Sequence, residues 1–288
     1  MSSPRFEHIL VVAHPQVKEA VNEAGQVAAL LQTHGVQAVN GLLYDEGLRT
    51  RLKAGEFDLL IALGGDGTML RAGHLCAPLQ VPILGINMGR FGFLTEIKQE
   101  QWRSVLPRLF EGGFWLEKRM MLRAEQWRAG ERLGVWDVLN EVVVSRGYTV
   151  RPVHLGASVD GRYLATYVAD ALIAATATGS TAYALAAGGP ILAPELRNIV
   201  LVAVAPHLSI DRALVLAEGS TLSITVHSDH QAVLSPDGQV PIGMADDDRV
   251  DVRAGEHPVL FLRFQDPGYF YRNLTPHMSQ NPSTGISR

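Results

Sequence analysis

The chain has 288 residues, of which 47% are hydrophobic and 19% charged, so it can build packed cores and is not mainly disordered. Its 25 Lys and Arg residues against 29 Asp and Glu residues give a net charge of −4, which argues against a nucleic-acid-binding protein. The one cysteine excludes a disulfide scaffold and a multi-cysteine metal site. No apolar run reaches the about 18 residues of a membrane span, and the polar first residues are unlike a signal peptide. We therefore expect a cytoplasmic protein without a membrane partner.

Strands and helices alternate over the first third of the chain. Short apolar runs rich in β-branched residues predict strands at residues 8–13, 36–43, 57–63 and 81–87. Apolar residues spaced three and four apart predict helices, over residues 16–34, 69–76 and 101–110. This order predicts βαβ units and a parallel, Rossmann-like sheet. We expect an α/β N-terminal domain over residues 1–116.

After Trp115 the helical patterns give way to short alternating runs. These predict strands at residues 121–126, 134–145, 153–159, 199–205, 221–226 and 259–264. Turn signals such as Asp160-Gly161 and Pro236-Asp237-Gly238 separate the runs. We expect a β-rich C-terminal domain over residues 117–265.

The motif GGDGT at residues 64–68 lies between a predicted strand and a predicted helix. Its glycines let a ligand approach the main chain, where the N–H groups of a helix start favour phosphate. The candidate phosphate-binding residues are Gly64, Gly65, Gly67 and Thr68. A loop that only bound phosphate would gain nothing from a carboxylate, so Asp66 indicates a base for a hydroxyl or a Mg²⁺ ligand. Arg71 offers a positive charge to phosphate. The alternative is a tight turn in which Asp66 or Thr68 caps the helix.

Two further polar motifs lie in the second part of the chain. Asn140 and Glu141 precede a β-branched run and suit ribose hydroxyls or a base edge, with an ordinary polar strand start as the alternative. Residues 176–190 are almost all small, which leaves room for a ligand that Tyr183 could stack on, or for close packing of an alanine-rich helix capped by hydroxyls. Asp170 lies in an apolar run, where a carboxylate needs a partner.

Three other features have a simpler structural interpretation. Asp246-Asp247-Asp248 predicts a solvated turn, with a divalent-metal site as the alternative. The turn at residues 236–239 predicts a hairpin in which Gln239 is a possible ligand contact. Cys76 is expected to be a small buried hydrophobe.

The GGDGT, Asn140-Glu141 and 176–190 motifs, in this order, resemble those of the ATP-dependent NAD kinases (inorganic polyphosphate/ATP-NAD kinases) over roughly residues 8–275. The resemblance implies phosphorylation of the 2′-hydroxyl of the adenosine ribose of NAD to give NADP, with ATP as donor and a divalent metal, Mg²⁺ above others. It also implies the NAD kinase-like fold, in which the chain end, about residues 266–288, returns to the first domain, and a homodimer or homotetramer.

The same resemblance assigns residues to roles. Asp66 would take the proton of the 2′-hydroxyl, and Asn140 and Glu141 would hydrogen-bond the adenosine part of NAD. The implied NAD-binding residues are Asp66, Gly67, Arg71, Phe93, Asn140, Glu141, Arg151, Asp170, Thr181, Ala182, Tyr183, Ala186 and Gln239. Family members often have Ser where this chain has Ala186, so this chain would lack one hydrogen bond to NAD that the resemblance implies. The resemblance assigns no metal ligands.

Two alternatives stay open. A diacylglycerol- or sphingosine-type kinase of small alcohols shares the GGDGT loop, and would need an apolar acyl groove in place of residues 176–183. A non-catalytic NAD(P)-sensing protein would use Asp66 only as a ligand contact and would not consume ATP. Neither alternative involves nucleic acid.

Overall fold

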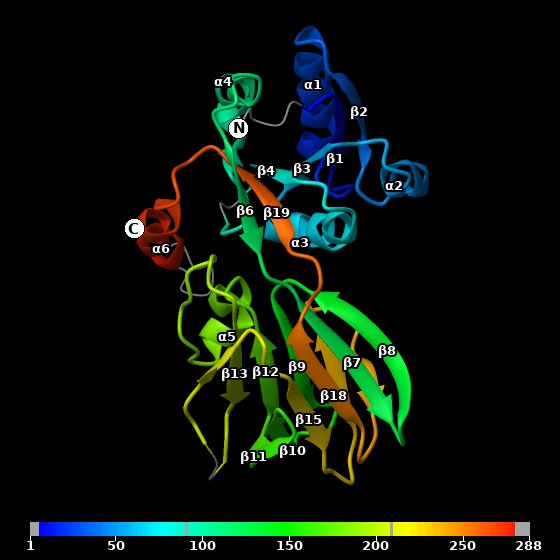
Figure 1. Cartoon of the computed structure of the whole chain (residues 1–288), viewed down its shortest axis with the longest axis vertical. Coiled ribbons are helices and arrows are strands. Elements are labelled where there is room, and N and C mark those ends of the chain that lie inside the picture. The colour runs from blue at the N-terminus through cyan, green and yellow to red at the C-terminus, as the bar shows by residue number, and fades with distance from the viewer. Residues whose placement is uncertain (1–5, 90–91, 208–209, 280–288) are drawn as a thin grey trace. The chain divides into compact units, whose positions relative to one another are not determined.

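A computed structural model describes residues 6–89, 92–207 and 210–279 (Figure 1). The chain divides into two units, a first unit of Met1–Lys118 with Val259–Arg288 and a second unit of Arg119–Pro258. The expected domain boundary, at residues 116 and 117, stays a prediction that limited proteolysis would test. Among the helices of these described ranges, none is both long enough and apolar enough to cross a membrane.

The first unit is built on a sheet with the strand order β2-β1-β3-β4-β19-β6, in which β5 also pairs with β4. Its strands are β1 (His8–Ala13), β2 (Gln37–Leu42), β3 (Leu59–Gly64), β4 (Ile83–Asn87), β5 (Ile97–Lys98), β6 (Trp115–Arg119) and β19 (Val259–Arg263). Neighbouring strands from β2 to β19 pair in parallel, which confirms the predicted parallel sheet. Both faces of β1 and β3 are buried, which explains their continuous apolar runs.

β19 enters this sheet from the far end of the sequence (Figure 1). The alternating pattern grouped residues 259–264 with the strands of the second part, but β19 pairs in parallel with β4. Val259, Phe261, Leu262 and Arg263 are all fully buried, as expected of a strand covered on both faces.

The first unit also contains helices, of which α1 (Lys18–Thr33) and α3 (Asp66–Cys76) pack against this sheet. The other helices are α2 (Glu46–Lys53), η1 (Ala77–Leu79), η2 (Gln99–Gln101), α4 (Trp102–Val105), η3 (Leu106–Leu109) and α6 (Tyr269–Ser279). The predicted α1 is confirmed, and its buried residues, spaced three and four apart, pack against β1 and β3 in one core. Cys76 is buried as expected, and burial raises the pKa of its thiol.

Two helical predictions need correction. Helix α2 was not foreseen, although Asp45 is a recognisable cap whose side chain accepts a hydrogen bond from the N–H of Leu48. The helix predicted over residues 101–110 is wrong as one element, because η2, α4 and η3 follow one another there. Pro107 contributes to this break, since it has no N–H to donate within a helix.

The second unit contains two antiparallel sheets, with the strand orders β11-β10-β15-β18-β7-β8 and β14-β13-β12-β9-β16-β17. The strands of the first are β7 (Leu122–Arg128), β8 (Glu131–Val138), β10 (Val153–Val159), β11 (Arg162–Ala169), β15 (Leu222–Val226) and β18 (Arg249–Ala254). Those of the second are β9 (Glu141–Arg146), β12 (Ala171–Ala175), β13 (Asn198–Val204), β14 (Leu214–Ala217), β16 (Ala232–Pro236) and β17 (Ile242–Met244). This confirms the β-rich second part.

The two sheets share one core, and the second sheet is buried on its other face as well. On β12, Leu172 and Ala174 point into the shared core, whereas Ala171, Ile173 and Ala175 pack in a second cluster with α5 (Tyr183–Ala186). The run predicted as one strand over residues 134–145 is divided into β8 and β9, which belong to different sheets. The chain changes sheets at Leu139 and Asn140, beside the candidate site.

Candidate functional site

The GGDGT motif spans the end of β3 and the beginning of α3. Gly64 is the last residue of β3, Gly65 is extended (φ −98°, ψ −170°), and Asp66 is the first residue of α3. The helix therefore begins three residues before the predicted residue 69, because the N–H groups of Thr68 and Met69 already bond to the carbonyl of Gly65. The capping alternative is wrong, since Gly65 is the cap residue of α3 and, among the described residues, no side chain caps this helix.

Asp66 is held by the backbone of a distant segment. Its Oδ2 accepts a hydrogen bond from the N–H of Phe93 (2.8 Å), and its Oδ1 accepts one from the N–H of Leu94 (3.1 Å). A Cβ at Gly92 would collide with the Asp66 carboxylate, so a glycine is needed for this close approach. Because a carboxylate oxygen has two acceptor positions, Asp66 can still accept a hydrogen bond from a hydroxyl of a ligand. The carboxylate is thus oriented without being saturated.

Two other predicted residues lie in the same unit as Asp66. Arg71 is exposed, its Nη1 donates to the carbonyl of Gly67 (3.2 Å), and its guanidinium lies 5.8 Å from the ring centre of Tyr44. Phe93 is half-buried, with its ring centre 6.3 Å from that of Phe270. For Phe93 the backbone bond to Asp66 is a role that the sequence did not predict.

In the second unit, the Asn140-Glu141 motif is bonded directly to the 176–190 motif. Thr176 Oγ1 donates to the carbonyl of Leu139 (2.6 Å), and the N–H of Thr176 donates to the carbonyl of Asn140 (2.9 Å). Thr176 Oγ1 also accepts from the N–H of Gly179 (3.0 Å), which starts the short helix η4 (Gly179–Thr181). A Cβ at Gly179 would collide with the backbone of Asn140. The structure therefore brings these two motifs together.

Asp237 is a functional candidate that the sequence analysis missed. Its buried carboxylate accepts hydrogen bonds from the N–H groups of Leu139 (2.7 Å), Asn140 (2.8 Å) and Glu141 (3.0 Å). Asp237 and Gly238 have positive φ angles of 46° and 64°, which confirms the predicted turn. That turn was the only sequence signal, and it gave no indication that the aspartate organises a segment nearly a hundred residues earlier.

Glu141 is buried beside this aspartate. Its Oε2 makes no hydrogen bond within the described residues. Burial, together with the negative charge of Asp237, raises the pKa of Glu141 to about 8. At pH 7 the neutral acid therefore predominates and can donate a hydrogen bond. A buried carboxyl oxygen without a partner is costly unless a ligand pairs with it.

The other candidate NAD-binding residues of the 176–190 motif differ in their exposure. Thr181 and Ala182 are half-buried, whereas Tyr183 and Ala186 are exposed on α5. The predicted alanine-rich helix is only one turn long, because Gly188 and Gly189 already return their N–H groups to Leu185 and Ala184. The predicted hydroxyl cap of this helix is wrong, because Ala182 is the cap residue of α5 and no side chain among the described residues caps it. Thr176 Oγ1 instead accepts the N–H of Gly179 at the start of η4.

Three other predicted contacts are surface residues. Gln239 is exposed, two residues after Asp237, and its N–H donates to the carbonyl of Pro236 (3.0 Å). The carboxylate of Asp170 lies 3.0 Å from Arg146 Nε, which confirms the expected partner, but Asp170 is half-exposed rather than buried. The reason is that Asp170 lies between β11 and β12 rather than within a strand. Arg151 is exposed.

Asp170 and Arg151 do not lie with Asn140 and Glu141 within one chain. On paired strands Ala171 faces Ser145 and Ala175 faces Glu141, so Asp170 and Glu141 lie at opposite ends of β12. At about 3.3 Å per residue this separates them by roughly 16 Å. Arg151 follows the far end of β9.

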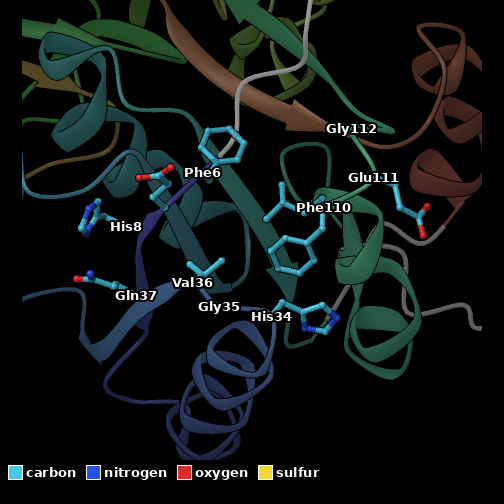
Figure 2. A pocket seen from close by; sticks show the side chains of 11 residues that line it. Phe6, His8, His34, Gly35, Val36, Gln37, Phe110, Glu111 and Gly112 are labelled. Carbon is cyan, nitrogen blue, oxygen red and sulfur yellow. The ribbon is translucent and has the colours of Figure 1, made fainter.

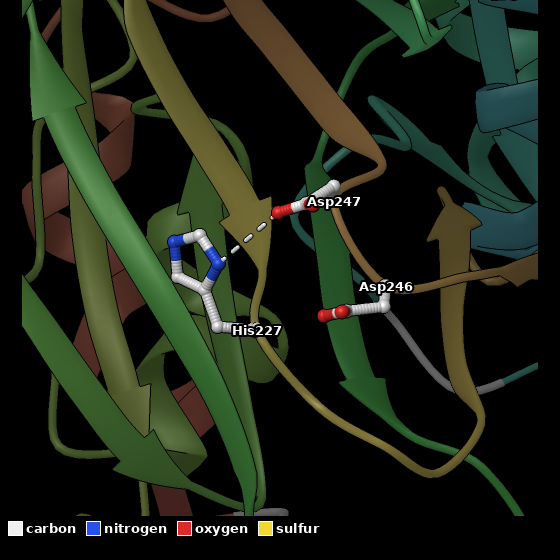
Figure 3. Close-up of side chains that lie close together, drawn as sticks. All are labelled: His227, Asp246 and Asp247. Atoms are coloured by element: carbon white, nitrogen blue, oxygen red, sulfur yellow. Dashed lines mark ion pairs between the residues drawn. The ribbon is translucent and has the colours of Figure 1, made fainter.

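The acidic turn at residues 246–248 is only partly as predicted. Asp248 is fully buried and bonds to Arg128 (2.7 and 2.8 Å), so it is not a solvated residue. Asp246 and Asp247 are exposed, and with His227 they form a group whose potential ligand atoms lie within 4.8 Å of one another (Figure 3). Such exposed groups are common without a metal, and we assign no ion to this one.

A cavity of about 570 Å³ in the first unit lies at the amino ends of the parallel strands β1 and β2 (Figure 2). It is lined by His8 and Gln37, the first residues of β1 and β2, and by the stacked rings of His34 and Phe110 (4.5 Å between centres). Ligands of open α/β sheets bind at the carboxyl ends of the strands. The GGDGT loop is at that carboxyl edge, and this cavity contains none of the predicted site residues.

Comparisons with known proteins agree with these motifs. The family models described as the ATP-NAD kinase N-terminal domain and the ATP-NAD kinase C-terminal domain match residues 9–114 and 139–264. The NAD kinase of Chloroflexus aurantiacus is 37% identical over 276 residues, covering 96% of this chain and 100% of that protein. The NAD kinase of Polaromonas naphthalenivorans is 36% identical over 274 residues, covering 92% and 94%.

Solved structures support the same fold. Yeast NADH kinase complexed with NADH has a TM-score of 0.85 at 22% identity, covering 99% of this chain and 91% of that one. An NAD kinase from Archaeoglobus fulgidus in complex with ATP has a TM-score of 0.74 at 25% identity, covering 94% and 98%. The expected fold class is thereby confirmed. Both family models match, and relatives are this similar along nearly the whole length, so the chain belongs to the ATP-NAD kinase family.

Proposed function

We propose that this chain transfers the γ-phosphoryl group of ATP to the 2′-hydroxyl of the adenosine ribose of NAD, giving NADP and ADP. The observation that carries the proposal is Asp66, a carboxylate at the first turn of α3 in a glycine-rich loop, oriented by two backbone N–H groups. A loop for phosphate alone would not include it. Family membership supports the same reaction.

Each group then has a chemical task. Phosphoryl transfer depends mainly on positioning and on stabilising negative charge. The backbone of residues 64–68 would bind the phosphates of ATP, and Asp66 would accept the proton of the 2′-hydroxyl, a role worth about 10²–10⁴ in rate. Asn140, Glu141 and Tyr183 would bind the adenosine of NAD. Glu141, as a neutral acid, can donate to a ring nitrogen or a ribose oxygen, which would pair its buried Oε2.

A divalent metal, Mg²⁺, would neutralise the phosphate charge. Mg²⁺ in kinases is usually held by the phosphates with one or two carboxylates. Asp66 is the carboxylate of the GGDGT loop, and both its oxygens already accept backbone N–H groups. We therefore propose that the phosphates of ATP would hold the metal, with Asp66 as at most one protein ligand. We also propose a cytoplasmic location, as expected from the sequence.

The polar side chains of the 176–190 motif favour NAD over a lipid as the acceptor. An acyl groove would need apolar walls at residues 176–183, but Thr176 and Ser180 instead form a network of hydrogen bonds with Leu139, Ala177 and Leu192. The decisive assay combines purified protein with ATP, Mg²⁺ and NAD, and detects NADP with an NADP-specific dehydrogenase. Absence of NADP despite NAD binding would favour a sensor, and absence of both would direct the search to lipid and alcohol acceptors.

Gly65→Ala is expected to fold normally and to raise the KM for ATP about tenfold or more, the equivalent of about 1.4 kcal/mol. A Cβ at Gly65 meets nothing within 4 Å, and its φ of −98° suits alanine, so the protein itself does not require glycine there. The space would be needed by phosphate instead. Gly219→Ala, also in open space, is the matched control for both the melting temperature and KM. An unchanged KM for ATP in Gly65→Ala would remove this loop from phosphate binding.

We further propose a homo-oligomer in which a neighbouring copy contributes Asp170 to the NAD site. The support is its position, since Asp170 is half-exposed and lies at the opposite end of β12 from Glu141. Mixing inactive Asp66→Asn and Asp170→Asn subunits should then restore activity at low NAD concentration, up to about a quarter of the native value in a randomly mixed dimer. A mixture no more active than its parts would assign Asp170 to its own surface ion pair with Arg146.

A further inference from the structure

Arg263, the last residue of β19, is a fully buried cation. Its Nε donates to Glu117 Oε2 (2.9 Å), and its Nη1 donates to Glu96 Oε2 (3.2 Å) and to the carbonyl of Leu94 (3.1 Å). β19 lies in the sheet between β4 and β6, with Glu117 on β6 (Figure 1). One side chain from near the end of the sequence therefore joins two segments that precede it by about 150 residues or more.

The two carboxylates that bind Arg263 accept further hydrogen bonds. Tyr269 Oη donates to Glu117 Oε1 (2.8 Å), and the N–H groups of Phe264 and Gln265 donate to Glu96 Oε1 (2.8 and 2.9 Å). Burial alone would lower the pKa of Arg263, but the facing Tyr269, Glu117 and Glu96 raise it, so the guanidinium stays charged.

Such a network is not explained by stability alone. Removing a cation and two carboxylates from water costs several kcal/mol per ion, and well-packed apolar residues of similar volume are often as stable or more stable. A buried ionic group does provide directional bonds, which apolar packing does not. The question is what these bonds orient.

Leu94 supplies the connection. Its N–H donates to Asp66 Oδ1, and its carbonyl accepts the hydrogen bond from Arg263 Nη1. Two residues later, the N–H of Glu96 donates to the carbonyl of Gly85 in β4 (3.0 Å). The segment is thus held by Arg263 and β4 on one side, and on the other it presents the two N–H groups that orient Asp66.

We propose that Arg263 is a positioning residue for Asp66: by fixing the carbonyl of Leu94, it holds the N–H groups of Phe93 and Leu94 in place to orient the catalytic carboxylate. This inference rests on the proposed function only in that Asp66 is the catalytic carboxylate. The connection from Arg263 through Leu94 to Asp66 is structural and can be measured without turnover.

Arg263→Lys tests the connection, because lysine keeps the charge but cannot reach Leu94, Glu96 and Glu117 together with one ammonium group. Arg128→Lys is the matched control, since Arg128 also forms a bidentate bond with a buried carboxylate, that of Asp248. For both variants we would measure kcat, the KM values for ATP and NAD, the melting temperature, and hydrogen–deuterium exchange of peptides covering residues 92–96.

The expected result is a 10- to 100-fold loss of kcat in Arg263→Lys with both KM values nearly unchanged, the effect of a misplacement of about 1 Å. Exchange at residues 92–96 should rise in this variant only, and Arg128→Lys should keep its kcat at a comparable loss of melting temperature. If Arg263→Lys does not fold, Glu96→Gln tests the same connection, because it keeps an acceptor for Phe264 and Gln265 but removes a charge that holds Arg263.

Two results would overturn the proposal. One is unchanged exchange at residues 92–96 in a folded Arg263→Lys protein, and the other is a kcat that falls equally in both arginine variants at equal loss of stability. Failure of the proposed function is a separate outcome, because a native protein that makes no NADP would still show whether exchange at residues 92–96 depends on Arg263.

Discussion

Asp66→Asn is expected to fold, to bind NAD as the native chain does, and to lose about 10²–10⁴ of its turnover. The carboxamide has nearly the same shape as the carboxylate but cannot take up the 2′-hydroxyl proton. It also has one acceptor atom where the carboxylate has two, so one of the N–H groups of Phe93 and Leu94 loses its partner. That loss should lower the free energy of unfolding by only about 1–3 kcal/mol. NADP formation, calorimetric NAD binding and denaturant unfolding check the three parts.

Asp58→Asn is the matched control for this variant. Asp58 also lies in the first unit, and its carboxylate accepts hydrogen bonds from the N–H groups of Glu7 (2.7 Å) and His8 (3.2 Å). Its replacement should cost similar stability and leave turnover unchanged. If Asp66→Asn retained turnover as Asp58→Asn does, Asp66 would be an anchor for residues 93–94 rather than a base.

Gly179→Ala is expected to have the second largest effect, because it disrupts the contact between the 176–190 motif and the Asn140-Glu141 motif. The new Cβ would collide with the carbonyl oxygen, carbonyl carbon and Cα of Asn140. These are backbone atoms, which the three N–H groups bonded to Asp237 hold in place, so neither side can yield cheaply. Overpacking of this kind should lower the free energy of unfolding by about 3 kcal/mol. NAD affinity should fall more than tenfold, because Asn140 and Glu141 move with the strained segment.

Gly243→Ala serves as its control. Gly243 lies in β17, in the sheet that also contains β9 with Glu141. The nearest atom to its new Cβ is a side-chain nitrogen of Gln231 at 3.9 Å. Its unfolding free energy should change by less than about 1 kcal/mol, and its NAD affinity should not change. Denaturant unfolding and calorimetry compare the two variants. Equal NAD affinities would mean that residues 139–141 and 176–181 do not form the NAD site.

Some of this architecture follows directly from local sequence. β1 was predicted with its observed bounds, and α1 within two residues, because burial of one face or of both leaves a periodic apolar pattern. The GGDGT loop and the Asn140-Glu141 strand start were also visible, since glycine and polar residues interrupt those patterns. Where several short helical turns follow one another, as around Pro107, the local pattern was not enough.

The sequence by itself therefore determined the alternation of strands and helices in the first unit, the motifs proposed to take part in the reaction, and the family. Tertiary structure decided which groups orient those motifs. Asp66 is bonded by residues 27 and 28 positions away, Asn140 by an aspartate 97 positions away, and Leu94 by an arginine 169 positions away. Asp237 and Arg263 each sit in a pattern with an ordinary local interpretation, a turn and a strand end. Their roles arise only when folding removes water from them, because a buried charge must then take its hydrogen bonds from whatever backbone or side chain the fold brings beside it.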